Sequence, residues 1–133
     1  NLLKSNIIFY DKLNKKELTN LYNKCDLGIG NLAFHRIRVK HSSSLKEREY
    51  FQAGLPIVSA SKDYCFNKLP DFRLQIPSND TSIQIQKLIK FVQYYKNFDK
   101  DGRKIKKYIK ENLLWEQTLK NLVNYLTLEK SYG

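Results

Sequence analysis

The chain has 133 residues, 41% of them hydrophobic and 28% charged, which is enough for one domain with a core and argues against disorder. No apolar run approaches the roughly 18 residues of a membrane span, and the N-terminal stretch lacks the layout of a signal peptide. Cys25 and Cys65 lack the spacing of a metal or thiol-exchange motif, so we expect reduced thiols in a cytosolic protein.

The formal net charge of the chain is +11. A positive field of this size favours anionic partners such as nucleic acid, a membrane surface or phosphorylated small molecules. An AT-rich genome, which inflates the number of lysine codons, explains the same charge without any partner, and the sequence leaves both explanations open. The chain begins with Asn1 and contains no methionine, so we expect it to be part of a longer protein.

Strands and helices are predicted to alternate over the first half of the chain. A helix from Lys15 to about Lys24 is predicted after the first apolar run, and Asn14 and Glu17 have the spacing of a capping box at its start. The apolar and alternating runs that predict strands are residues 6–10, 25–33, 57–60 and 72–76.

The next predicted helix runs from Leu45 to about Ala53. Ser44 and Glu47 have the spacing of a second capping box, and we expect Leu45 to help anchor the helix in the core. Gly54 supplies a left-handed C-terminal cap.

The rest of the chain is predicted to be mostly helical. A long amphipathic helix is expected after Asp80 or Thr81 as its N-cap, followed by helices over residues 99–111 and 115–129. The order of elements predicts an α/β fold, which is a Rossmann-like open parallel sheet of about four strands with flanking helices and a helical C-terminus.

The loop over residues 31–44 is the first place to expect a ligand. Ligands of open parallel sheets bind at the carboxyl ends of the strands, close to helix N-termini, and this loop joins the second strand to the helix at Leu45. Free N–H groups in the first turn of a helix favour an anion. Arg36, Arg38 and Lys40 add positive charge, so a phosphate or diphosphate is a sensible ligand.

Several motifs of the chain occur in the order of a known family. "NIIFYDKLNKKELTNLYNKCD", "CDLGIGNLA", "SSLKEREYFQAGLPIVSAS" and "NLLWEQTLKNLVNYL" follow one another along residues 6–126. They resemble the C-terminal, nucleotide-sugar-binding domain of GT-B glycosyltransferases of family 4, also called glycosyl transferases group 1. The resemblance implies that residues 1–133 are a single, incomplete donor-binding domain that lacks the N-terminal acceptor domain and its own first strands.

The family's signature is a pair of glutamates eight positions apart, the second preceding an A-x-G-x-P motif. Glu49 matches the second glutamate, and the resemblance implies that it accepts hydrogen bonds from the ribose hydroxyls of a nucleotide-diphosphate sugar. The alternative is a solvated helix glutamate paired with a neighbouring basic side chain. The first glutamate is replaced by His41, which either contacts the donor sugar or a phosphate or is a loop residue without a role.

Four further residues complete the predicted donor site. Ser42, Ser43 and Ser44 match the positions where the family meets the diphosphate, although serines before a helix are also common as caps. Lys46 adds charge to the same anion or extends into solvent. No metal and no cofactor are implied besides the nucleotide-diphosphate sugar, which is the donor substrate.

The resemblance implies a hexosyltransferase-type enzyme that transfers sugar to a glycan or lipid-linked acceptor in polysaccharide or cell-surface glycan biosynthesis. We expect a cytoplasmic protein, peripheral at the inner face of the membrane if the acceptor is lipid-linked, and expect residues 1–133 alone to be inactive. The alternative is a basic module without catalysis that binds nucleic acid or a membrane surface. No specific nucleic-acid-binding motif favours that alternative, and the basic run over residues 100–110 is typical of a solvated helix face.

Overall fold

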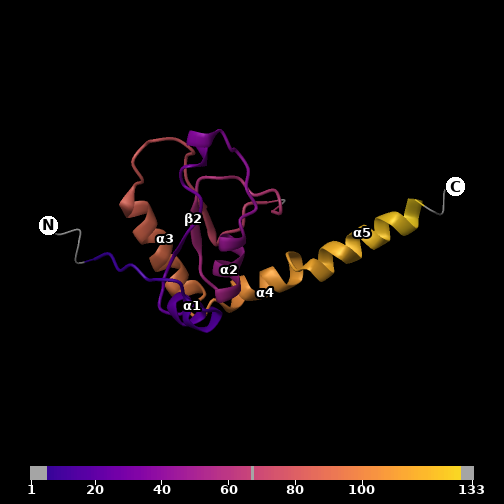
Figure 1. The fold of residues 1–133 in the computed structure, drawn as a ribbon, viewed down its shortest axis with the longest axis horizontal. Coiled ribbons are helices and arrows are strands. Elements are labelled where there is room, and N and C mark those ends of the chain that lie inside the picture. Colours follow the sequence, from indigo (N-terminus) through magenta and orange to yellow (C-terminus); the bar gives the residue numbers. More distant parts are fainter. Residues whose placement is uncertain (1–5, 67, 130–133) are drawn as a thin grey trace.

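The computed structural model describes residues 6–66 and 68–129 of the chain. Helices flank a small sheet, and the last helix extends away from the body of the domain (Figure 1). In chain order the elements are α1 (Lys15–Tyr22), β1 (Gly28–Ile29), the 3-10 helix η1 (Phe34–Ile37), α2 (Leu45–Ala53), β2 (Ile57–Ser59), β3 (Arg73–Gln75), α3 (Ile85–Phe98), α4 (Arg103–Asn112) and α5 (Trp115–Glu129).

The sheet is parallel and has the order β1-β2-β3. Val58 on the central strand pairs with Ile29 on one side and Leu74 on the other. The prediction of an α/β fold with an open parallel sheet is therefore confirmed. Three strands are present among the described residues instead of about four.

The missing strand is the one expected at residues 6–10. This segment has no strand structure, and Ile8 and Phe9 are 72% and 91% exposed. An extended apolar segment forms a strand only when a neighbouring strand satisfies its N–H and C=O groups. No described strand lies beside this segment, so the prediction of a strand here was wrong.

The helix boundaries follow their local caps. The capping box of Asn14 and Glu17 is present at α1, and Gly54 ends α2 in the left-handed conformation with φ 82°. The prediction that Asp80 or Thr81 caps α3 was wrong, because this helix begins after Gln84. Asp80 instead accepts hydrogen bonds from Arg36, and the Thr81 hydroxyl donates to Asn79 Oδ1 at 2.6 Å.

The helix expected from residue 99 begins only at Arg103. Gly102 lies in the left-handed region with φ 64° and prevents an earlier start. The Asp99 carboxylate caps the new start, since it accepts hydrogen bonds from the backbone N–H groups of Lys104 and Ile105. The basic side chains of α4 are exposed, as predicted for a solvated face.

Two hydrophobic clusters lie on opposite faces of the sheet, because successive strand residues point to opposite faces. Ile57 belongs to the larger cluster and Val58 to the smaller one. The larger cluster joins α2, α3 and α4, and its buried residues are Phe51, Ile57, Phe66, Phe72, Tyr95, Ile105 and Ile109.

Candidate functional site

A cavity of about 740 Å³ lies at the carboxyl ends of β2 and β3. Two chain segments form its wall and are tied together by their backbones. His41 and Lys62 form a parallel bridge, Ser42 N donates to Lys62 O at 2.8 Å and Lys62 N to Lys40 O at 3.2 Å. The volume lies within the roughly 300–1,000 Å³ that is typical of small-molecule sites.

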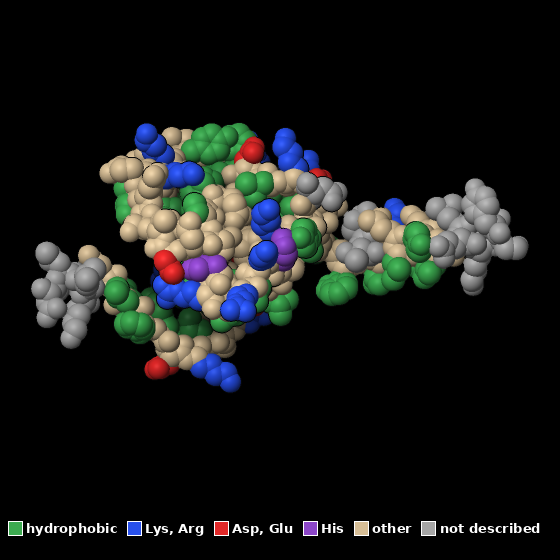
Figure 2. Space-filling model, turned by 90° about the horizontal axis from the view of Figure 1, so that it is seen from above, with side chains coloured by type: hydrophobic (Ala, Val, Ile, Leu, Met, Phe, Trp, Pro, Cys, Tyr) green, Lys and Arg blue, Asp and Glu red, His purple; other side chains and the backbone are tan. Residues whose placement is uncertain are grey.

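The lining of this cavity is positively charged. Both histidines and several Lys and Arg side chains gather on this face of the molecule (Figure 2). None of the described residues that line the cavity is acidic, so its field favours a negatively charged ligand. We call this cavity the basic cavity. The cationic and protonatable residues of its lining are His35, Arg38, Lys40, His41 and Lys62.

Arg38 reaches the basic cavity from an unusual backbone conformation. Its φ of 58° and ψ of 22° place it in the left-handed region, where it ends η1. Such a conformation costs a residue other than glycine on the order of 1–3 kcal/mol. Hydrogen bonds from Arg38 N to His35 O and from Val39 N to Phe34 O hold it in place.

The two histidines of the basic cavity have different partners. His35 Nε2 lies 3.1 Å from Asp80 Oδ1, and its buried Nδ1 has no hydrogen-bond partner among the described residues. Hydrogen bonds from Arg36 and, after it, from His35 lower the pKa of Asp80. His41 Nε2 lies 2.8 Å from the Tyr64 hydroxyl.

The three predicted serines lie beside the start of α2 and do not line the basic cavity. Ser42 Oγ accepts from Asn31 Nδ2 at 3.2 Å, and Ser43 Oγ accepts from Arg48 at 2.8 Å. Ser44 is the N-cap residue, but its side chain makes no capping hydrogen bond. Lys46 Nζ contacts Gly30 O at 3.5 Å.

Glu49 lies in a different place, a groove of about 590 Å³ between α1 and α2. The Tyr22 hydroxyl donates to Glu49 Oε2 at 3.2 Å. Burial and, second to it, the Glu49 carboxylate raise the pKa of Tyr22 to about 12. The groove shares no lining residue with the basic cavity, so the structure does not bring Glu49 and His41 together in one site.

The glutamate that the structure buries is Glu47, which is 0% exposed. The prediction that it forms a capping box with Ser44 was wrong. Its Oε1 accepts hydrogen bonds from Ser59 Oγ at 2.8 Å and from Asn31 N at 3.3 Å. Leu45, expected in the core, is 83% exposed, because the helix turns the face of Glu47 toward the sheet.

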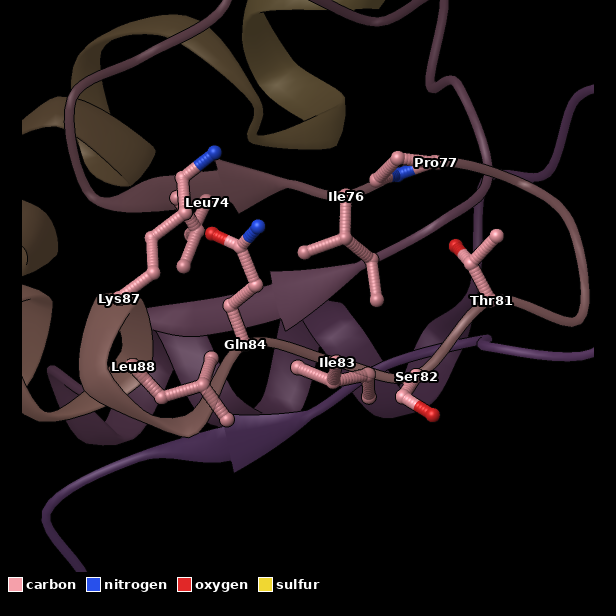
Figure 3. Close-up of a pocket in the computed structure, with 9 residues that line it drawn as sticks. All are labelled: Leu74, Ile76, Pro77, Thr81, Ser82, Ile83, Gln84, Lys87 and Leu88. Carbon is pink, nitrogen blue, oxygen red and sulfur yellow. The ribbon is translucent and has the colours of Figure 1, made fainter.

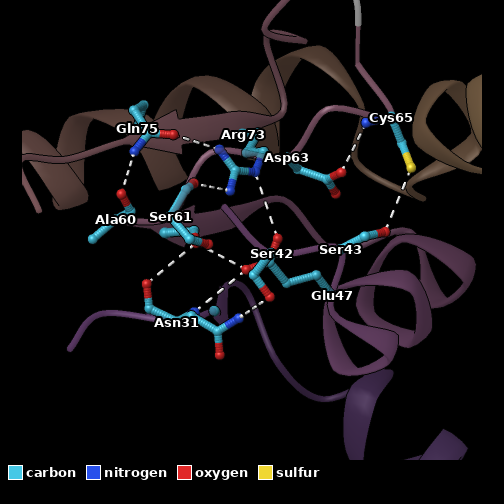
Figure 4. Close-up of polar contacts among 12 residues, drawn as sticks. Asn31, Ser42, Ser43, Glu47, Ala60, Ser61, Asp63, Cys65, Arg73 and Gln75 are labelled. Carbon is cyan, nitrogen blue, oxygen red and sulfur yellow. Dashed lines mark hydrogen bonds and ion pairs between the residues drawn. The ribbon is translucent and has the colours of Figure 1, made fainter. Parts of the chain in front are cut away.

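Arg73, which is 2% exposed, completes the environment of Glu47. Its Nε lies 3.5 Å from Glu47 Oε2, and neither atom has a hydrogen-bond partner among the described residues. The same guanidinium donates to Ser61 O and to Gln75 Oε1, both at 2.5 Å. Figure 4 shows how this buried pair, which we call the Glu47–Arg73 clamp, ties α2 to the carboxyl ends of the strands.

The clamp continues to the basic cavity through Gln75, one of the residues that line it. Gln75 Nε2 donates to Ala60 O at 2.7 Å, so it also ties β3 to the end of β2. Glu47 and Phe51 are four residues apart and therefore lie on one face of α2. The backbone of β1 approaches this face closely, because at Gly30 any side chain would collide with Glu47 Oε1.

A smaller cavity of about 160 Å³ lies between β3 and the start of α3 (Figure 3). Its walls are mostly apolar, and Ile76, Ile83 and Leu88 contribute to them. The volume is below the range of typical ligand sites. We therefore consider the basic cavity the stronger candidate.

Within the described residues, no cluster of His, Cys, Asp and Glu side chains is suited to hold a metal ion. No described helix is long and apolar enough to cross a membrane. Both cysteines are free thiols. Comparisons of the chain with family models, with curated proteins and with solved structures find no match.

Proposed function

We propose that the chain is the donor-binding part of a glycosyltransferase and that the basic cavity holds the phosphate groups of a nucleotide-diphosphate sugar. The observation that carries the proposal is the cavity itself. Its five cationic or protonatable side chains lie at the carboxyl ends of parallel strands, which is where open α/β sheets bind their ligands.

The chemistry of the lining suits a diphosphate. Arg38, Lys40 and Lys62 offer permanent positive charge, and arginine and lysine are the side chains that bind phosphate best. The described residues include no acidic partner for these three side chains. An anion that binds these three side chains therefore does not have to break an existing ion pair. The His41 imidazole also lines the cavity and adds a ring nitrogen that can hydrogen-bond to a phosphate oxygen.

The nucleotide-sugar part of the proposal is supported by the family resemblance of the motifs. The proposal assigns the diphosphate to the basic cavity and includes His41 among its contacts. A ligand that extends from the cavity along the chain would next meet the start of α2. The residues there are Ser42, Ser43, Ser44 and Lys46. The ribose contact of Glu49 is a separate expectation, because its carboxylate is in the groove between α1 and α2.

We expect residues 1–133 to bind the donor without transferring sugar. The motifs of residues 1–133 resemble only the donor-binding domain of the family, and the described residues that line the cavity include no carboxylate that could act as a general base. Sugar transfer by these residues alone, measured with a radiolabelled donor, would contradict this expectation.

The experiment is a calorimetric titration with UDP, GDP and ADP and with their sugar derivatives. We expect at least one of them to bind, and expect the double variant Arg38→Gln/Lys62→Gln to weaken binding about tenfold or more, since each charged hydrogen bond contributes roughly 1.5–3 kcal/mol. The matched control is Lys107→Gln/Lys110→Gln on α4, which removes the same charge far from the cavity. Equal weakening by both double variants would show a non-specific charge effect and overturn the proposal.

A second candidate, binding to an anionic membrane surface, has one observation in its favour. The exposed basic face of α4 leads directly into α5, whose Trp115, Leu119 and Leu122 are 78%, 52% and 51% exposed. Basic and apolar side chains on adjoining helices suit a membrane interface. Co-sedimentation with anionic vesicles but not with neutral vesicles would support this candidate, and Lys107→Gln/Lys110→Gln would then reduce binding.

A further inference from the structure

Tyr64 stands out among the exposed aromatic residues because its ring is held in place beside the basic cavity. The side chain is 75% exposed. Its ring stacks on His41, with 4.1 Å between the ring centroids and 23° between the ring planes. His41 lines the basic cavity, so Tyr64 is separated from the cavity by a single side chain.

The loop that carries Tyr64 is anchored on both sides of this residue. The Asp63 carboxylate, fully buried, accepts from Arg48 at 2.5 Å and from Cys65 N at 3.0 Å. Phe66 packs into the larger hydrophobic cluster, with its ring 5.9 Å from that of Phe51. A side chain fixed in this way loses little freedom when a ligand binds, which favours affinity.

An exposed ring with one covered face leaves its other face for a ligand. The core does not use Tyr64, and its hydroxyl is already paired with His41 Nε2. Planar nucleobases stack on such aromatic rings and tolerate any base, because every base presents a π-face. In a nucleotide only the ribose separates the base from the phosphates, and Tyr64 is in direct contact with a residue of the cavity lining, His41.

We propose that the free face of Tyr64 stacks on the nucleobase of a nucleotide whose phosphates occupy the basic cavity. This inference rests on the proposed function for the position of the phosphates. It assigns to Tyr64 a role that Glu49 and the serines do not have, namely the contribution of the base to affinity.

The experiment compares ligands that have a base with ligands that lack one. Calorimetric dissociation constants are measured for UDP, GDP and ADP, for inorganic pyrophosphate and for glucose 1-phosphate, with the unaltered chain and with three variants. Tyr64→Leu removes the ring and Tyr64→Phe removes only the hydroxyl. Tyr94→Leu is the matched control, because Tyr94 is 49% exposed and also stacks on a neighbouring ring, that of Phe98, at 5.2 Å.

We expect Tyr64→Leu to weaken nucleoside diphosphate binding about tenfold and to leave pyrophosphate binding unchanged, while Tyr64→Phe and Tyr94→Leu bind all ligands within about twofold of the unaltered chain. Three results with Tyr64→Leu would overturn the stacking role. The first is unchanged nucleotide binding, and the second is a loss of binding confined to glucose 1-phosphate. The third is an equal loss of pyrophosphate binding, which would mean that Tyr64 only orients His41. In each of these cases pyrophosphate binding by the unaltered chain still supports the phosphate site. If neither nucleotides nor pyrophosphate bind, the proposed function and the stacking role fail together.

Discussion

Replacing Glu47 with glutamine should destabilise the domain far more than any change at Glu49. Glutamine keeps the size of the side chain but removes its charge. The guanidinium of Arg73, which is 2% exposed, then loses the carboxylate 3.5 Å away, which is its only ion-pair partner among the described residues. Breaking a buried ion pair by removing one partner costs about 3–5 kcal/mol. Typical domains have about 5–15 kcal/mol of stability in total, so this one change removes a large share of it.

The assay is urea unfolding followed by far-ultraviolet circular dichroism, because the single tryptophan, Trp115, is 78% exposed and reports poorly on the core. The matched control is Glu49→Gln on the same helix. Glu49 is exposed, and its hydrogen bond with Tyr22 is long at 3.2 Å, so we expect a loss below about 1 kcal/mol.

A double-mutant cycle tests whether the loss comes from the pair. Glu47→Gln/Arg73→Met removes both charges, and its loss should be smaller than the sum of the two single losses. A loss below about 1 kcal/mol for Glu47→Gln, or single losses that simply add, would contradict a stabilising pairing of the two buried charges.

Three further predictions test the fold and the α1–α2 groove. Gly54→Ala should destabilise the domain by more than about 1 kcal/mol in the same urea assay. Gly54 has a φ of 82°, and an added Cβ would lie 2.8 Å from Gly102 Cα. A neutral result would contradict the close approach of α2 and α4. Phe51→Ala should cost about 3–5 kcal/mol, since Phe51 is 0% exposed and its ring lies 5.1 Å from that of Phe72; a loss near 1 kcal/mol would contradict the central place of this ring in the core. Because the pKa of Tyr22 is raised to about 12 from 10.0, its contribution to stability should be full below pH 10 and be lost as the pH rises toward 12. The difference in unfolding free energy between the unaltered chain and Tyr22→Phe should show this loss. In a tyrosinate absorbance titration, Glu49→Gln should lower the pKa of Tyr22 only part of the way back to 10.0, because burial is the larger cause of the shift. An unchanged titration would contradict the pairing of Tyr22 with Glu49.

The sequence predicted the elements of the fold well where local signals decide them. The capping box at Asn14, the left-handed cap at Gly54 and the helix over residues 115–129 are all present. Local signals failed where distant residues compete for the same groups. Asp80 was expected to cap α3, but it is engaged by Arg36, which is 44 residues away in the chain.

The candidate site was predicted only in part for the same reason. The sequence located the basic loop around Arg38, Lys40 and His41 and its place at the carboxyl ends of the strands. Lys62 joins this region through its bridge with His41, and the clamp residue Arg73 joins it through the pairing of β2 with β3. No local pattern shows either contact. The exposure of Leu45 and the burial of Glu47 depend on how α2 is rotated against the sheet, and its charged sequence left that rotation undecided.

The measurement that tests the account most directly is a titration of the chain with inorganic pyrophosphate at low and at high salt. We predict saturable binding that weakens with added salt, because the contacts are between charges near the surface, and that weakens about tenfold or more in Arg38→Gln/Lys62→Gln but not in Lys107→Gln/Lys110→Gln. Absence of saturable binding at low salt, or binding that both double variants reduce equally, would contradict the assignment of the basic cavity as a phosphate site.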